Sequence, residues 1–280
     1  MKMHYRRYFW LPLALLLIAC RSACAIDLNS GSVGPLSWQV TNLTPTYSGS
    51  EAVQRAREYL GTSSPVEIKV GKFVQVSDAT PYGNIRKTVF YAWLLTASEV
   101  PVAKLDGSAT SKVNLMLLIN ARDKGLDAAF TDKNLATWVS RDTSISETQE
   151  PDLFLTMMAD GWRIDKPAVQ LNSTVSQVLS AFWQTTDIDP ANAGQLFLRP
   201  RTIVLTAPPR QTTDKSVPLR HGATYWTVLV SGTKILDVGA STATGSTEAQ
   251  QSASPNTVMS GLFALFDDIG ALWVRSYYLP

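Results

Sequence analysis

The amino-acid sequence predicts an α+β protein made of two units, each a helix packed on an antiparallel sheet. Two segments, 50–60 and 174–183, carry apolar residues at the i, i+3, i+4 spacing of an amphipathic helix. Each is followed by several apolar or alternating runs that are typical of strands. Residues 141–152 lie between the two sets, are charged and hydroxyl-rich, and have the composition of a linker. The shared order, a helix and then strands, also permits a degenerate tandem repeat.

The first unit covers residues 26–140 and starts with a turn-rich lead-in over 26–49. Its helix is expected to end at Gly61, because glycine is favoured just after the last helical turn. The segment 66–76 alternates between apolar and polar residues, which predicts a strand with one solvated face. The other elements expected in this unit are apolar strands over 88–97 and 113–119, a returning strand over 126–130 and a short helix around 135–139.

The second unit covers residues 153–280, and its helix starts with a capping box. Thr174 and Gln177 stand at the spacing that lets each side chain bond the backbone N–H of the other residue. The elements expected after this helix are strands over 196–206, 223–230 and 234–238, a tight turn at 231–233, a flexible loop over 239–257, a helix over 258–269 and a strand over 272–279.

Three stretches of the first unit, EAVQRAREYLG, TVFYAWLLTAS and LMLLINARDKGLDAAF, resemble the PepSY-like and cystatin-like small domains of exported bacterial proteins. In those domains a helix packs on an antiparallel sheet, and a strand ending in a D-x-x-G-type turn leads into one last strand. The likeness covers about residues 50–131. It implies a binding or inhibitory module, with no catalytic residue to carry over. The second unit departs from the pattern at KILDVG, which lacks that spacing.

The first 25 residues predict an export signal. Lys2, Arg6 and Arg7 form a cationic front, and the apolar run from Phe9 to Ala19 is interrupted only by Pro12. This run is too short for a membrane-spanning helix, which needs about 20 apolar residues. A short apolar core behind a basic front is typical of a secretory signal peptide.

The end of this segment leaves two cleavage sites open. Ala23-Cys24-Ala25 has small residues where a signal peptidase reads, so cleavage there releases a chain that begins at Ile26. Leu17-Ile18-Ala19-Cys20 resembles the bacterial lipobox, in which the cysteine carries a lipid. The expected location is therefore the periplasm or the medium, with an outer-membrane lipoprotein attached through Cys20 as the alternative. The sequons at Asn42 and Asn172 would also fit a eukaryotic secreted protein.

Composition excludes several classes of function. The whole chain has 25 Lys and Arg against 23 Asp and Glu, and removing Lys2, Arg6, Arg7 and Arg21 leaves 21 against 23. The mature chain is therefore slightly acidic, about −2, and no overall electrostatic argument favours nucleic acid as a partner. Both cysteines precede Ile26, so a chain released there has no disulfide, thiolate metal site or cysteine nucleophile.

His221 is the one histidine that follows the signal segment, so a site with two histidine ligands is excluded. The sequence contains no phosphate-binding loop, dinucleotide fingerprint, nucleophile elbow or zinc-peptidase motif. We therefore expect no cofactor and no metal. His221 precedes a predicted strand, where it fits either an exposed loop residue or the general base of a hydrolase. The adjacent pair Asp267-Asp268 gives no support for glycosidase chemistry, whose carboxylates face each other across a cleft.

Five basic residues fall within a short stretch opposed only by Asp214, which makes this region locally basic. Strand alternation places the first two on one face with apolar neighbours, which their aliphatic stems would cover. An anionic or carboxylate-rich partner would fit this stretch, and so would an ordinary solvated strand and loop. These candidate partner-binding residues are Arg199, Arg201, Arg210, Lys215 and Arg220.

These observations favour an exported protein of the bacterial envelope that binds another envelope or secreted protein and is not an enzyme. One alternative is an exported hydrolase with His221 as its base, and another is an assembly factor anchored by a lipid on Cys20. Contact with a membrane is expected only through that anchor. The sequence does not favour any one oligomeric state.

Overall fold

The computed structural model describes residues 28–62, 64–80, 87–131, 162–166, 170–205, 219–236 and 258–279. Within these ranges no helix is long and apolar enough to cross a bilayer. Several sequence predictions fall outside them: the export signal with Cys20, the helix around 135–139, the linker 141–152, the loop 239–257, and the side chains of Arg210 and Lys215.

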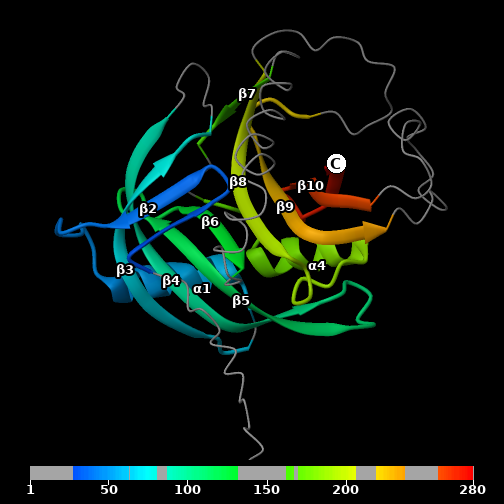
Figure 1. The fold of residues 1–280 in the computed structure, drawn as a ribbon, viewed down its shortest axis with the longest axis horizontal. Coiled ribbons are helices and arrows are strands. Elements are labelled where there is room, and N and C mark those ends of the chain that lie inside the picture. The colour runs from blue at the N-terminus through cyan, green and yellow to red at the C-terminus, as the bar shows by residue number, and fades with distance from the viewer. Residues whose placement is uncertain are drawn as a thin grey trace, which may run out of the picture.

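The described residues form one antiparallel sheet that curls into a half-barrel, with two helices against it (Figure 1). The sheet order is β1-β2-β3-β4-β5-β6-β8-β9-β10-β11, and β7 pairs with β8. The strands are β1 (Ser30–Val33), β2 (Leu36–Val40), β3 (Glu67–Asp78), β4 (Thr88–Ala103), β5 (Thr110–Asn120), β6 (Leu126–Thr131), β7 (Trp162–Asp165), β8 (Gln195–Leu205), β9 (Ala223–Leu236), β10 (Val258–Asp267) and β11 (Trp273–Leu279). The helices are α1 (Gly49–Leu60) and α4 (Val175–Thr186).

The predicted fold class, two helix-on-sheet units, is wrong. The two halves share one sheet, because β6 pairs with β8 through Ala129 opposite Leu198 and Phe130 opposite Phe197. Every residue of β6 is buried, so this strand is not the exposed edge of a separate unit. A run that is apolar on both faces must be covered on both sides and have a neighbour at each edge. The continuous sheet supplies these contacts.

The two faces of the sheet contribute to two separate cores. On β5, Leu115, Leu117 and Ile119 pack in the core that contains both helices, whereas Met116 and Leu118 belong to the other core. Among the described residues, the second core contains no helical residue: each of the eleven strands contributes at least one side chain, and Leu219 adds one from the turn before β9. It therefore lies inside the curl of the sheet.

Contacts between distant strands show how strongly the sheet curls. Strands β2 and β6 are four positions apart in the sheet order, which corresponds to about 19 Å if the sheet were flat. The rings of Trp38 on β2 and Phe130 on β6 nevertheless have centroids 5.6 Å apart. Register shifts in the β3–β4, β4–β5 and β5–β6 pairs mark bulges, which increase local bending and twist.

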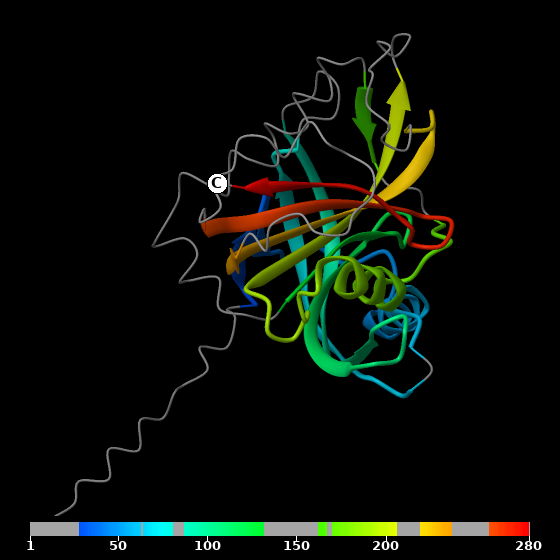
Figure 2. The ribbon, with the colours of Figure 1, turned by 90° about the vertical axis from the view of Figure 1, so that its right-hand side faces the viewer.

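Both helices form where the sequence predicts them. Ser48 caps α1 by accepting from the Glu51 backbone N–H, and Gly61 ends it in the left-handed region at φ 64°. Thr174 and Gln177 make the capping box at the start of α4. Figure 2 shows the helices side by side with the β4–β5 hairpin bending around them. The expected strands at 66–76, 88–97, 113–119, 126–130, 196–206 and 272–279 are confirmed, with shifted or longer bounds.

Three local predictions are wrong. Residues 258–267, expected as helix, form β10, because the apolar side chains of residues 262–266 are buried alternately in the two cores and the strand pairs with β9 and β11. The expected turn at 231–233 is absent, because β9 continues through it to Leu236 and bends at a register shift. The lead-in 26–49 contains the β1–β2 hairpin, whose turn uses Gly34 at φ 51°.

Candidate functional site

The structure separates the basic residues that the sequence groups together. Arg199 and Arg201 lie on β8 and are 1% and 0% exposed. Arg220 and His221 are exposed in the turn that precedes β9. Arg199 and Arg201 therefore do not share a surface with Arg220, and the expected basic binding face does not include them.

Arg199 forms a buried ion pair across the interior of the half-barrel. Its Nη2 lies 2.6 Å from Oδ2 of Asp78, and its Nη1 donates to Oδ1 of Asp78 at 3.3 Å and to Oγ1 of Thr80 at 3.0 Å. Its Nε donates to the backbone oxygen of Asp127 at 3.2 Å. One guanidinium thus joins the end of β3, the start of β6 and the middle of β8, so it helps to close the curl.

The Asp78 carboxyl has its charge stabilised at this position. Burial by itself would raise its pKa, but the Arg199 guanidinium more than offsets that effect and holds the pKa of Asp78 well below its usual range. Arg201 and the Thr80 hydroxyl act in the same direction. The backbone N–H of Thr80 also donates to Oδ1 of Asp78 at 2.9 Å. The pair is therefore ionised under ordinary conditions.

Asp127 lies in the same cluster but has the opposite electrostatic behaviour. Burial raises the pKa of its carboxyl to about 7, although Arg199 and a bond from Asn120 act to lower it. The Asn120 side-chain amide donates to Oδ2 of Asp127 at 2.9 Å. The nearby carboxylates of Asp123 and Asp78 add to the increase. Asp127 can therefore gain or lose a proton near neutral pH.

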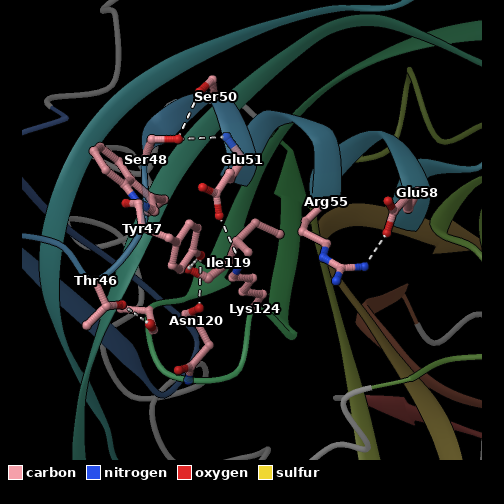
Figure 3. Close-up of polar contacts among 12 residues, drawn as sticks. Thr46, Tyr47, Ser48, Ser50, Glu51, Arg55, Glu58, Ile119, Asn120 and Lys124 are labelled. Carbon is pink, nitrogen blue, oxygen red and sulfur yellow. Dashed lines mark hydrogen bonds and ion pairs between the residues drawn. The ribbon is translucent and has the colours of Figure 1, made fainter.

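A second set of contacts ties this cluster to the start of α1 (Figure 3). The Tyr47 hydroxyl donates to the backbone oxygen of Asn120 at 2.9 Å, and the Lys124 ammonium lies 5.1 Å from the centre of the Tyr47 ring. Lys124 also pairs with Glu51 at 2.9 Å. Burial raises the pKa of the Tyr47 phenol, and Asp123 adds to this. The phenol therefore stays protonated and acts as a hydrogen-bond donor.

The interior cluster is shielded from solvent. None of its six members, Asp78, Thr80, Asn120, Asp127, Arg199 and Arg201, is more than 8% exposed. A catalytic group must reach its substrate, whereas these groups are bonded to one another and to the backbone. The arrangement supports a structural role, in which charged and polar groups hold distant strands together.

Asp268 organises a second site, in the turn between β10 and β11. Its Oδ1 accepts the Ser173 backbone N–H at 3.0 Å and the Trp226 indole N–H at 3.1 Å. Its Oδ2 accepts the backbone and side-chain N–H groups of Asn172 at 2.9 and 3.1 Å. The Ser173 hydroxyl donates to the backbone oxygen of Asp268 and accepts the Ala271 N–H. This turn is therefore bonded to the residues that precede α4.

The same turn presents two aliphatic side chains to solvent. Ile269 and Leu272 are each 66% exposed, although Ala271 between them is buried. Two hydrogen bonds fix the turn: the Asp267 N–H donates to the Leu272 backbone oxygen at 2.9 Å, and the Leu272 N–H donates to the side-chain Oδ1 of Asp267 at 3.0 Å. We call Ile269, Leu272 and the adjoining Arg220 and His221 the tip face.

The loop that carries Arg220 and His221 adjoins this turn. The Asp268 N–H donates to the Thr224 oxygen at 3.2 Å, and Arg220 Nη2 lies 3.9 Å from Oδ2 of Asp267. The Arg220 N–H donates to the Tyr225 hydroxyl at 2.8 Å, which holds the loop against β9. His221 is exposed there, whereas a histidine base works best in a site that excludes water. In the described ranges no cluster of His, Cys, Asp and Glu could hold a metal ion.

Comparisons of the chain with family models, with curated proteins and with solved structures found no match. The resemblance of residues 50–131 to PepSY-like and cystatin-like domains therefore stays a prediction.

The structural role of the carboxylates at both sites was not predicted from the sequence, where Asp268 is considered only as part of the pair Asp267-Asp268. Asp78 continues the apolar face of β3 that Val74 and Val76 define, and Arg199 and Arg201 continue that of β8. An acid on the apolar face of one strand and a base on the apolar face of another indicate a buried ion pair. Only the sheet topology shows that β3 and β8 bring Asp78 and Arg199 together. Asp268 gave no comparable signal, because its donors lie far away in the chain: Asn172 and Ser173 are 96 and 95 residues earlier, and Trp226 is 42 residues earlier.

Proposed function

We propose that this chain is an exported, non-catalytic binding protein of the bacterial envelope, and that its partner is another envelope or secreted protein. The N-terminal signal pattern supports export. The tip face supports the binding part of the proposal. Its turn is held by several buried hydrogen bonds and presents two exposed aliphatic side chains. Exposed apolar groups on a rigid support are typical of interaction sites.

The interior cluster supports the non-catalytic part of the proposal. Its acids and bases bond one another out of reach of solvent, and their placement explains how distant strands of the curled sheet are held together. The exposed His221 has no support as a hydrolase base from its position in the turn.

The test is chemical cross-linking in cells of the source organism. The full chain with a C-terminal epitope tag should fractionate with the envelope and give a discrete species heavier than the monomer after treatment with an amine-reactive cross-linker. The control is the chain without residues 1–25, which stays in the cytoplasm and should lose that species. A full chain that stays cytoplasmic, or that is recovered only at monomer mass, would overturn the proposal.

A matched variant separates the two forms of export. Cys20→Ser should leave the intact mass and the fractionation of a released protein unchanged. If the parent has the mass of the chain from Cys20 plus a lipid, and Cys20→Ser gives no species of that mass, the chain is anchored through Cys20 and is an envelope lipoprotein.

A further inference from the structure

We propose that the tip face inserts its two aliphatic side chains, Ile269 and Leu272, into an apolar pocket of a partner protein, and that a carboxylate beside the pocket pairs with Arg220. This inference rests on the proposed binding function and adds to it the surface used and the chemistry of the partner.

The tip face is organised before any partner arrives. Asp268 accepts four N–H bonds from Asn172, Ser173 and Trp226 through its carboxylate. The turn also closes on itself through the two bonds between Asp267 and Leu272. Little backbone freedom is then lost on binding, which is the main entropic penalty that an exposed loop otherwise incurs.

Packing of the turn does not require the two exposed aliphatic groups. Ala271 is buried in the helix-side core, so the turn already contributes its share to packing through that residue. Ile269 and Leu272 point away from the core and are each two-thirds exposed. A polar residue at either position would keep the two bonds between Asp267 and residue 272, because those bonds use backbone atoms of Leu272 and none of Ile269.

The size of the apolar group favours a protein pocket over a lipid surface. The two side chains together have fewer carbons than one myristoyl chain, which alone gives only marginal membrane binding, about 10⁴ M⁻¹. Two adjacent aliphatic groups are enough, however, to form the centre of a protein interface whose surrounding contacts exclude water. The tip face would then act as a projection that fits a complementary recess.

The charge beside these side chains indicates an acidic rim on the partner. The Arg220 side chain is 53% exposed, and its distance of 3.9 Å from Asp267 is at the long end for an ion pair. The Asp267 carboxylate is itself mostly covered and is engaged by the Leu272 N–H. A carboxylate from a partner can form a shorter, two-point bond with the exposed guanidinium.

The experiment places a photoreactive amino acid, p-benzoylphenylalanine, at His221, which leaves Ile269, Leu272 and Arg220 intact. The matched control carries the same probe at Leu105, which is 67% exposed in the β4–β5 turn. Irradiation in cells should give one adduct of discrete mass from the His221 probe and none of that mass from the Leu105 probe. Mass spectrometry of the adduct should locate the cross-linked peptide of the partner next to an acidic residue.

Substitutions in the His221-probe background then test each part of the surface. Leu272→Ser and Arg220→Glu should each lower the adduct yield about tenfold or more, and Leu105→Ser should leave it unchanged. With the partner purified, raising the salt from about 50 to about 500 mM should weaken binding by the parent chain more than by Arg220→Ala. Unchanged urea midpoints for these variants would show that the losses do not come from unfolding.

Several outcomes would overturn the inference. An adduct of twice the chain's mass identifies a second copy as the occupant. Co-sedimentation with vesicles of phosphatidylethanolamine and phosphatidylglycerol, lost in Leu272→Ser, identifies a lipid surface. If amine-reactive cross-linking gives the envelope complex while the His221 probe gives no adduct, the proposed function stands and the tip face is not its site. If both fail, the binding function itself is overturned.

Discussion

Asp78 and Asp268 are both buried carboxylates, at 1% and 3% exposed, but different groups stabilise them. Asp78 faces the Arg199 guanidinium in a two-point ion pair. Asp268 is held by neutral N–H donors, including the Ser173 backbone and the Trp226 indole. Burial disfavours the charged state of a carboxylate. A buried carboxylate therefore needs either an opposite charge or several hydrogen-bond donors beside it.

The difference between the two sites matches the distance over which each acts. The Asp78–Arg199 pair joins strands that are four positions apart in the sheet, so it stabilises the curl of the whole half-barrel. The Asp268 bonds connect one turn to the start of α4, so they fix a local shape on the surface. The first site is expected to control global stability, and the second to control both stability and the presentation of the tip face.

The largest effect is expected from Arg199→Met. The substitution leaves the Asp78 carboxylate buried without its opposite charge, which should lower the free energy of unfolding by about 3–5 kcal/mol. Urea denaturation measures the change. The control is Arg55→Met on α1, whose pair with Glu58 is about half exposed and should be worth about 0.5 kcal/mol or less.

A double variant tests whether the two groups act as a pair. Asp78→Leu combined with Arg199→Met removes both charges, and should recover much of the loss seen in Arg199→Met alone. If the losses of the two single variants simply add, the ion pair is not what closes the curl.

Asp268→Ala should lower the free energy of unfolding by about 3 kcal/mol, because it leaves several buried N–H donors without an acceptor. Hydrogen exchange at the Ser173 amide should also become faster, since that N–H donates to the lost carboxylate. Asp268→Asn keeps one acceptor oxygen and should lose less. The exposed Glu67→Ala serves as the control. If the free energy of unfolding of Asp268→Ala is within about 0.5 kcal/mol of the parent value, the N–H bonds to this carboxylate do not stabilise the fold.

Asp127→Asn should change how the free energy of unfolding depends on pH between about pH 4 and pH 8. The folded pKa of Asp127, about 7, is above its unfolded value of about 3.9, so folding favours the protonated form. Its contribution to stability is complete below about pH 4 and is lost as the pH rises to about 7. The variant should therefore equal the parent near pH 4 and exceed it by about 2–4 kcal/mol at pH 8.

Urea denaturation of both chains between pH 4 and 8 measures this difference. Asp78 has the opposite sign, because its lowered pKa gives stability that is present above about pH 4 and is lost as the pH falls further. A difference between Asp127→Asn and the parent that does not change with pH would show that Asp127 does not titrate in this range.

Local patterns in the sequence predict most elements of the fold but not how they join. The end of α1 at Gly61, the capping box at Thr174 and the alternation of β3 depend on neighbouring residues, and these predictions are confirmed. The error in β10 has a physical cause. Leu262, Phe263, Leu265 and Phe266 satisfy a helical spacing as well as a strand buried on both faces, and only β9 and β11 on either side decide between the two.

The candidate site was less predictable because it depends on long-range contacts. The sequence identifies Arg199 and Arg201 as unusual on an apolar strand face, but the partner of Arg199 lies 121 residues earlier in the chain. The exposure of Arg220 and His221 agrees with their loop composition. Ile269 and Leu272 were placed in a helix and the strand after it, so their shared exposure in one turn could not be seen before β10 and β11 were known.

The smallest predicted effect tests whether the Asp268 site depends on the first half of the chain. Gly61 ends α1 at φ 64°, and a Cβ there would lie too close to the side chain of Thr174, the residue that caps α4. Gly107 has a similar φ of 73°, but a Cβ there would meet nothing within 4 Å. Both alanine variants incur left-handed backbone strain of about 1 kcal/mol, and Gly61→Ala should incur about 1 kcal/mol more from the contact.

Thr174 directly follows Ser173, which bonds Asp268 and accepts the Ala271 N–H. A shift of Thr174 should therefore reach the turn and speed hydrogen exchange at the Ala271 amide in Gly61→Ala but not in Gly107→Ala. If exchange there is equal in the two variants, the turn is fixed by α4 and Trp226 alone. If it is faster in Gly61→Ala, the end of α1 is part of what holds the tip face, and the local site and the global fold are coupled through this contact.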